Sequence, residues 1–146
     1  MTDQERPALV TFAGNDLFVG TTPSGHSIAI DTDHERSSAP SPVELLLVAL
    51  GSCTAVDVIS ILRKKREKVF EYRVEIAGTR REEHPRAFIR MEVKHILTGH
   101  NLSDKSVSQA IELSDTKYCS VAATLRPTVE IVSSYEVIEE DRELLQ

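Results

Sequence analysis

The chain has 146 residues, 40% of them hydrophobic, and a formal net charge of −6 at pH 7, which predicts one domain with a substantial core and argues against nucleic acid as a partner. Its N-terminus is polar and its longest apolar run is short, so we expect no signal peptide and no membrane span. Two cysteines are too few for a disulfide-stapled secreted scaffold, and we therefore expect a cytoplasmic location.

Three short strand signals occupy residues 8–31. The segments ALVTFAG, DLFVGTT and HSIAIDT are rich in β-branched and aromatic residues, and glycine- and proline-containing turns separate them. This pattern predicts an antiparallel meander that offers one face to a core. The acidic residues and the histidine of the following loop, 31–40, lack the spacing of a calcium-binding loop, so we interpret them as ordinary loop polarity.

Residues 41–66 predict one long helix with Cys53 near its middle. Ser41 suits the N-cap, and Glu44 completes a Ser-x-x-Glu capping box. Four basic residues at the other end fit the negative end of the helix dipole. A helix that is apolar over most of its circumference is typical of a core or an oligomer interface. We therefore expect a second copy of the chain, in a homodimer, to cover part of this helix.

The remaining elements follow from periodicity and turn residues. In chain order they are strands at 70–81 and 87–97, a helix at 103–117, a short helical segment from Cys119 to 125 and a strand at 128–137. Short turns between strands favour an antiparallel sheet, and the class is α+β with the order βββ-α-ββ-α-β. We expect a single domain over 1–146, with a core at 8–137 and a frayed acidic tail at 139–146.

The two cysteines, Cys53 and Cys119, are the residues that carry possible chemistry. Judged alone, each is typical of a buried structural thiol, since free cysteine is among the most buried residue types. The motifs CxxC and HExxH are absent, and none of the five histidines lies near a cysteine in sequence. The sequence therefore predicts no metal site and no cofactor.

Taken together, these features resemble the family of osmotically inducible and organic-hydroperoxide-resistance proteins (OsmC/Ohr), over nearly the whole chain. The resemblance rests on the Pro-x-Glu-Leu opening of the long helix at 42–45, on Cys53 just past its middle, on Cys119 opening a short helix, and on the element order. The pattern is most similar to a divergent branch of the family. It implies an intertwined homodimer in which the sheets wrap around paired central helices, with active sites at the subunit interface.

The resemblance also implies a thiol peroxidase that reduces organic hydroperoxides in the oxidative stress response. A Cys53 thiolate would attack the O–O bond and become a sulfenic acid. Cys119 would then condense with it to a disulfide, which an external dithiol reduces. The apolar surround of Cys53 favours alkyl hydroperoxides but disfavours a thiolate, so a cation must lie near the sulfur. In the family an arginine–glutamate pair fulfils this role.

Three residues are candidates for that supporting role. Glu44 lies nine residues before Cys53, on the opposite side of a straight helix, and its capping role also explains its presence. Asp57 lies four residues after Cys53, shares its face and can orient a cation or substrate. Arg36 fits the arginine best by sequence position, although three arginines of the hairpin, at 80, 81 and 86, stay open as alternatives.

Two functions of other classes also remain open. One is a non-catalytic binder of a small apolar ligand at the dimer interface, with both cysteines merely buried. The other is a redox sensor whose disulfide changes the binding of a partner.

Overall fold

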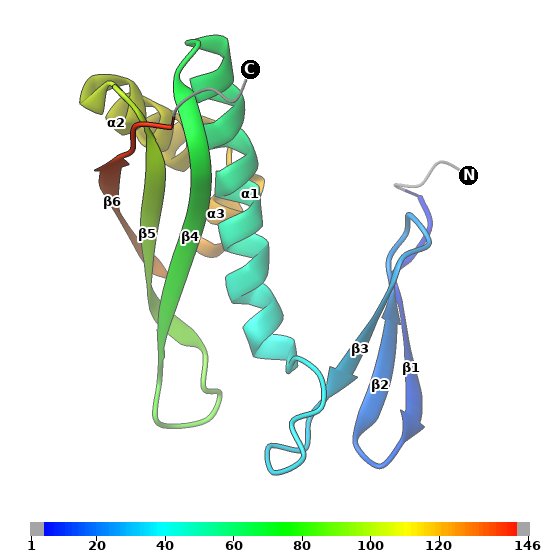
Figure 1. Cartoon of the computed structure of the whole chain (residues 1–146). Helices are drawn as coiled ribbons and strands as arrows, with labels where there is room; N and C mark the ends of the chain where they lie inside the picture. Colours follow the sequence, from blue (N-terminus) through cyan, green and yellow to red (C-terminus); the bar gives the residue numbers. More distant parts are fainter. Residues whose placement is uncertain (1–4, 143–146) are drawn as a thin grey trace. The chain divides into compact units, whose positions relative to one another are not determined.

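The computed structural model describes residues 5–142, which form two compact units divided between Leu46 and Leu47. The α+β class and the element order expected from the sequence are confirmed, including the short helical segment before the last strand (Figure 1). The end of the helix expected at 103–117 is a π-helical segment. The expectation of a single domain stays a prediction. The elements are β1 (Leu9–Gly14), β2 (Leu17–Thr21), β3 (Ser27–Asp31), α1 (Pro42–Lys64), β4 (Lys68–Arg80), β5 (Phe88–His100), α2 (Asp104–Leu113), η1 (Ser114–Tyr118), α3 (Ser120–Leu125) and β6 (Glu130–Glu139).

The first unit contains the antiparallel meander β1-β2-β3, as the sequence predicts. The turn between β1 and β2 takes three successive residues with positive φ, beginning with Gly14 at φ 92°. Asn15 and Asp16 follow at φ 49° and 62°, a region that asparagine and aspartate tolerate better than most residues. The register shifts between Phe12 and Gly14, so the glycine accommodates an irregularity next to the turn.

Helix α1 begins where the capping residues predict. The backbone N–H of Ser41 donates to Glu44 Oε1 at 3.0 Å, and the N–H of Glu44 donates to Ser41 Oγ at 3.4 Å. These reciprocal bonds satisfy two backbone donors that a helix N-terminus leaves free. Arg63 and Lys64 end the helix, where positive charge complements the dipole.

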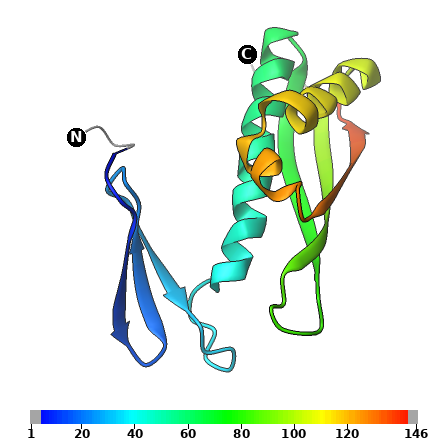
Figure 2. The same ribbon diagram turned by 180° about the vertical axis from the view of Figure 1, so that it is seen from behind.

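The second unit is built on the three-stranded sheet β4-β5-β6, and its last strand departs from the expected antiparallel pairing. Strands β4 and β5 form the predicted antiparallel hairpin, but β6 runs parallel to β5. The physical reason is the connection between them. The segments α2, η1 and α3 connect the end of β5 to the start of β6 and cross over the sheet. Strand β6 therefore begins at the end of the sheet where β5 also begins, and the two strands run in the same direction. The three helices and η1 cover one face of this sheet, as Figure 2 shows from behind.

The core of the second unit lies between the sheet and helices α1 and α2. Its central cluster combines buried aliphatic residues of three elements: Val58, Leu62, Leu97, Val107, Ala110 and Ile111. Gly51 lets α1 approach β4 closely, because a Cβ at this position would collide with the side chain of Ile76. The face of α1 that holds Leu50 and Thr54 is therefore fixed on the sheet. Cys53 directly precedes Thr54 in the sequence.

Other residues of α1 stay uncovered in the single chain. Val48 and Val56 are 64% and 66% exposed. By length and composition alone, α1 also meets the requirement for a membrane span, with 23 residues and a mean hydropathy of 2.2. The small and polar residues of this helix interrupt its apolar runs, so the length of the longest run does not reveal its overall hydropathy. Core helices of water-soluble proteins meet the same requirement, and α1 packs its other face on the sheet.

A buried histidine of this core bonds to a half-buried tyrosine. His95 on β5 is 0% exposed, and its Nδ1 lies 2.7 Å from the hydroxyl of Tyr72 on β4. Its Nε2 has no hydrogen-bond partner within residues 5–142. Burial lowers the pKa of His95 to about 4, because an imidazolium cannot be hydrated there, and burial likewise raises the pKa of Tyr72. Both side chains are therefore neutral near pH 7.

The pKa of His95 predicts a loss of stability in acid. Because its folded pKa of about 4 lies below the ordinary 6.5, its stabilising contribution is fully present above pH 6.5 and is lost as the pH falls toward 4. Between pH 7 and pH 4.5 this amounts to about 2 kcal/mol of unfolding free energy. Urea unfolding of wild type and of His95→Phe at both pH values measures it. The variant should lose about 2 kcal/mol less on acidification, and an identical loss would contradict the prediction.

Candidate functional site

The structure brings the two cysteines together within one subunit. Cys53 is half-buried on α1, and Cys119 is buried at the junction of η1 and α3; both are free thiols. Cys53 lies next to Cys119, and this proximity is one of the causes that raise the pKa of Cys119. Two cysteines that are far apart in the sequence are therefore neighbours in the fold.

Cys119 is held by its own backbone and by the helix that follows. Its extended backbone (φ −73°, ψ 101°) makes it the N-cap of α3, where its Sγ accepts from the N–H of Ala122 at 3.4 Å. Its own N–H donates to the carbonyl oxygen of Ser114 at 2.9 Å. Burial, followed by the contact with Cys53 and the charge of Asp57, raises the pKa of Cys119 to about 11, although the Ala122 hydrogen bond opposes this. Cys119 is therefore a neutral thiol near pH 7.

Asp57 belongs to a small hydrogen-bonded network beside the two thiols. The hydroxyl of Ser114 donates to Asp57 Oδ2 at 2.9 Å, and Thr54 Oγ1 lies 2.9 Å from Ser114 Oγ. Since a serine hydroxyl carries one hydrogen, Thr54 must be the donor in the second bond. Asp57 and Thr54 stand on α1, and Ser114 begins η1, so the network joins the two segments that carry the cysteines. The predicted role of Asp57 toward a cation or substrate stays a prediction.

Ser114 is a site residue that sequence reasoning missed. In the helix predicted at 103–117 it falls on one helical stripe with the apolar residues Val107, Ala110 and Ile111, and all four side chains are buried. A hydroxyl within such a stripe needs a hydrogen-bond partner, because an unpaired polar group is costly in a core. That mismatch was the signal that pointed to a partner on another element.

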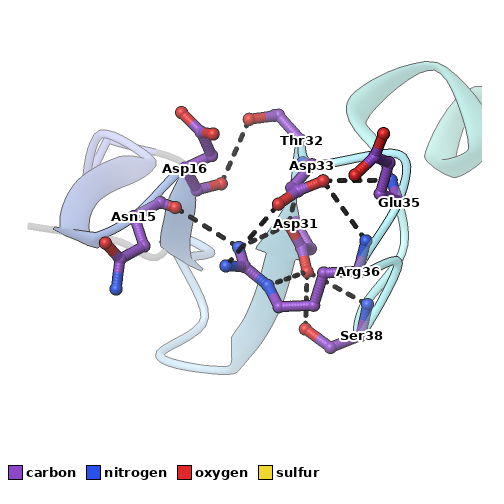
Figure 3. A network of polar contacts seen from close by, with 8 residues as sticks. All are labelled: Asn15, Asp16, Asp31, Thr32, Asp33, Glu35, Arg36 and Ser38. Atoms are coloured by element: carbon purple, nitrogen blue, oxygen red, sulfur yellow. Dashed lines mark hydrogen bonds and ion pairs between the residues drawn. The ribbon is translucent and has the colours of Figure 1, made fainter.

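Glu44 and Arg36 lie in the first unit and have partners there. The backbone N–H of Ser41, and then its side chain, lower the pKa of Glu44 through the capping box. Arg36 makes a two-point contact with Asp31, from Nε to Oδ2 at 2.9 Å and from Nη2 to Oδ1 at 2.8 Å (Figure 3). Cys53 belongs to the second unit, and the catalytic roles of Glu44 and Arg36 stay predictions.

Asp31 organises the loop that carries Arg36. It is 3% exposed, and besides the guanidinium it accepts from the N–H of Asp33 at 2.9 Å and from the N–H and hydroxyl of Ser38 (Figure 3). Arg36 first, and Ser38 second, hold the pKa of Asp31 well below its ordinary value. The loop polarity predicted from the sequence is thus an ordered network around one buried carboxylate.

A possible metal-binding group lies on the surface of the second unit. His100 Nδ1 is 3.1 Å from Glu139 Oε1 and 3.0 Å from Asp141 Oδ1, and within residues 5–142 no other such group of three is found. These side chains are largely exposed, and Glu139 also accepts from the N–H of Asn101. Polar contacts between exposed neighbouring side chains explain the arrangement, and the absence of a metal site stays a prediction.

Comparisons with known proteins agree on one family. Residues 33–134 match the sequence model described as OsmC-like protein. The chain is 46% identical over 121 residues to Protein YhfA of Escherichia coli K12, which covers 83% of this chain and 90% of that protein. A solved structure from Aquifex aeolicus VF5 is 34% identical with a TM-score of 0.82, over 92% of this chain and 97% of that one. The organic hydroperoxide resistance protein OhrB of Bacillus subtilis shares the fold alone, at 13% identity, a TM-score of 0.60, and coverage of 90% and 98%.

The raised pKa of Cys119 predicts a distinctive alkylation profile. The rate at which iodoacetamide modifies Cys119 in the reduced protein should rise about tenfold per pH unit from pH 7 to pH 10 without a plateau, because the thiolate is the reacting species. Peptide mass spectrometry separates Cys119 from Cys53. The urea-unfolded protein serves as the reference, with a plateau near pH 9. A plateau below pH 9.5 in the folded protein would refute the prediction.

Proposed function

Because the chain belongs to the OsmC-like protein family, we propose that it acts on peroxides, as a cysteine-based peroxidase that reduces organic hydroperoxides. Membership in this family supports a peroxide-related role in oxidative stress. The observation that carries the finer proposal is the contact between Cys53 and Cys119 within one subunit. Two neighbouring free thiols, one half-buried and one buried, support an intramolecular disulfide step.

The proposed reaction has two covalent steps. The Cys53 thiolate attacks an oxygen of the hydroperoxide, so that an S–O bond forms, the O–O bond breaks, and the alkoxide takes a proton to leave as an alcohol. Cys119 then loses its proton and attacks the Cys53 sulfur. The S–S bond forms, the S–O bond breaks, and hydroxide leaves as water with the proton that Cys119 released. An external dithiol returns both cysteines to thiols and becomes a disulfide itself.

The different settings of the two thiols support this division of roles. Cys53 is half-buried, so a substrate can reach it, whereas Cys119 is 3% exposed and has a pKa of about 11. A resolving thiol needs only to reach its partner sulfur. We further propose a cytoplasmic location, where dithiol donors are available to reduce the disulfide.

A cation near Cys53 is part of the proposal, since the thiolate must be stabilised in an apolar setting. Arg36 remains the first candidate for this cation, with Glu44 and Asp57 as supporting carboxylates. The buried Asp31 already orients the guanidinium of Arg36, which favours a fixed rather than a mobile cation.

A homodimer is also part of the proposal. Val48 and Val56 on α1 are 64% and 66% exposed, and a second copy of the chain that covered them would remove an apolar surface from water. We expect light scattering at micromolar concentration to give twice the 16.2 kDa mass of the chain. A stable folded species at 16.2 kDa would contradict the dimer but would leave the proposed peroxidase reaction unaffected.

Single-cysteine variants test the peroxidase reaction. We expect Cys53→Ser to abolish the reaction with cumene hydroperoxide, because the attacking sulfur is gone. Cys119→Ser should consume about one equivalent and stop as a sulfenic or over-oxidised acid, because closure of the disulfide is prevented. Mass spectrometry after one equivalent of peroxide distinguishes these products, and Ser120→Ala is the matched control that keeps both thiols.

The same experiment separates the alternatives. Turnover with a dithiol such as dithiothreitol supports the peroxidase, whereas a single oxidation without turnover favours the redox sensor. If Cys53→Ser reacts at the wild-type rate and Cys119→Ser is inert, the two roles are reversed. If the wild type is inert, the peroxidase proposal fails and a binder of a small apolar ligand takes its place.

A further inference from the structure

Ser114 makes bonds to both of the segments that carry cysteines. Its side chain donates to Asp57 and accepts from Thr54 on α1, and its carbonyl oxygen accepts the N–H of Cys119 at 2.9 Å. Ser114 is 0% exposed, so these bonds do not compete with water. Within residues 5–142, Ser114 thus gives a direct hydrogen-bonded route from the helix of Cys53 to the backbone of Cys119.

The π-helical geometry of η1 makes this double contact possible. In an α-helix, residues five apart are rotated by about 140° from each other, because each residue turns the chain by about 100°. The bond from the N–H of Cys119 to the oxygen of Ser114 joins residues five apart, so Cys119 lies one π turn after Ser114. Single π turns are rare in proteins, and those that occur often lie at functional sites. Here the turn ends at the buried thiol of Cys119.

We infer that Ser114 is a positioning residue, which holds Cys119 against Cys53 for disulfide closure. This inference rests on the proposed function for its chemistry, namely the attack of Cys119 on the Cys53 sulfenic acid with the release of water. The rate of such a step depends on the placement of the two sulfur atoms, since a small displacement of reacting groups is costly. Ser114 fixes η1 to α1 at Thr54 and Asp57, one and four residues after Cys53.

An equilibrium measurement tests the inference without any peroxide. Protein equilibrated with mixtures of oxidised and reduced dithiothreitol gives the stability of the Cys53–Cys119 disulfide by mass spectrometry. Ser114→Ala should reduce the effective concentration of the two thiols about tenfold, which for this two-electron couple is a reduction potential about 30 mV less negative. Ser114→Thr keeps the hydroxyl and should restore most of the wild-type value. Ser120→Ala, an exposed position next to Cys119, should match wild type.

A kinetic measurement separates positioning from general structural damage. In a single turnover with cumene hydroperoxide, Ser114→Ala should form the Cys53 sulfenic acid within about twofold of the wild-type rate. Closure should be about tenfold slower, so that a 1,3-dicarbonyl trap captures more sulfenic acid and excess peroxide over-oxidises more Cys53. A change in the first step alone, or equal closure rates in wild type and Ser114→Ala, overturns the inference.

The remaining outcomes are also decisive. If Ser114→Ala does not fold, Thr54→Val removes one of the two side-chain bonds at nearly constant volume and should slow closure about threefold; no slowing overturns the inference. If wild type is inert toward the hydroperoxide, the proposed function fails, but the dithiothreitol equilibrium still decides whether Ser114 positions the pair. If wild type forms no disulfide in dithiothreitol buffers, both fail together.

Discussion

The packing of α1 on the sheet β4-β5-β6 is the constraint on which the candidate site depends. Leu50, Val58 and Leu62 fix one face of the helix in the core, and Gly51 allows its backbone to approach Ile76 on β4. Cys53 is thereby held at the edge of this packed face. The crossover through α2 and η1 covers the same side of the sheet and brings Cys119 to Cys53. A parallel β5–β6 pair follows from this crossover, so the topology and the thiol contact have one origin.

Most of the fold could be predicted from the sequence, because its signals are local. The capping residues Ser41 and Glu44 predict the start of α1, and β-branched and aromatic residues, alternation and turn residues together predict the strands. The parallel direction of β6 could not be predicted in this way. Turn residues predict the direction of two strands that a short turn connects. After a helical crossover, the direction of the next strand depends instead on where the helices pack.

The candidate site was less predictable, since its contacts are not local. The sequence identified both cysteines and the shared face of Asp57, but not the serine that joins Asp57 to the segment of Cys119. Arg36 was identified by position, whereas its partner Asp31 was interpreted as loop polarity. Each missed residue is a buried polar group whose partner lies on another segment or across a loop. Periodicity finds such a residue only as an exception to an apolar pattern, and the partner requires the folded chain.

The burial of Cys119 has two opposing effects, and their balance explains why placement matters more than acidity in this site. With a pKa of about 11, on the order of one Cys119 in ten thousand is a thiolate at pH 7, so as a free thiol it would attack slowly. The same burial holds Cys119 next to Cys53. Well-oriented neighbouring groups react as though present at concentrations of 10⁵ M or more in favourable cases, which exceeds a loss of about 10⁴ in thiolate. In the proposed reaction, a thiol of this kind would resolve a sulfenic acid only while its position is maintained, so the hydrogen bonds that hold η1 on α1 would be part of the chemistry.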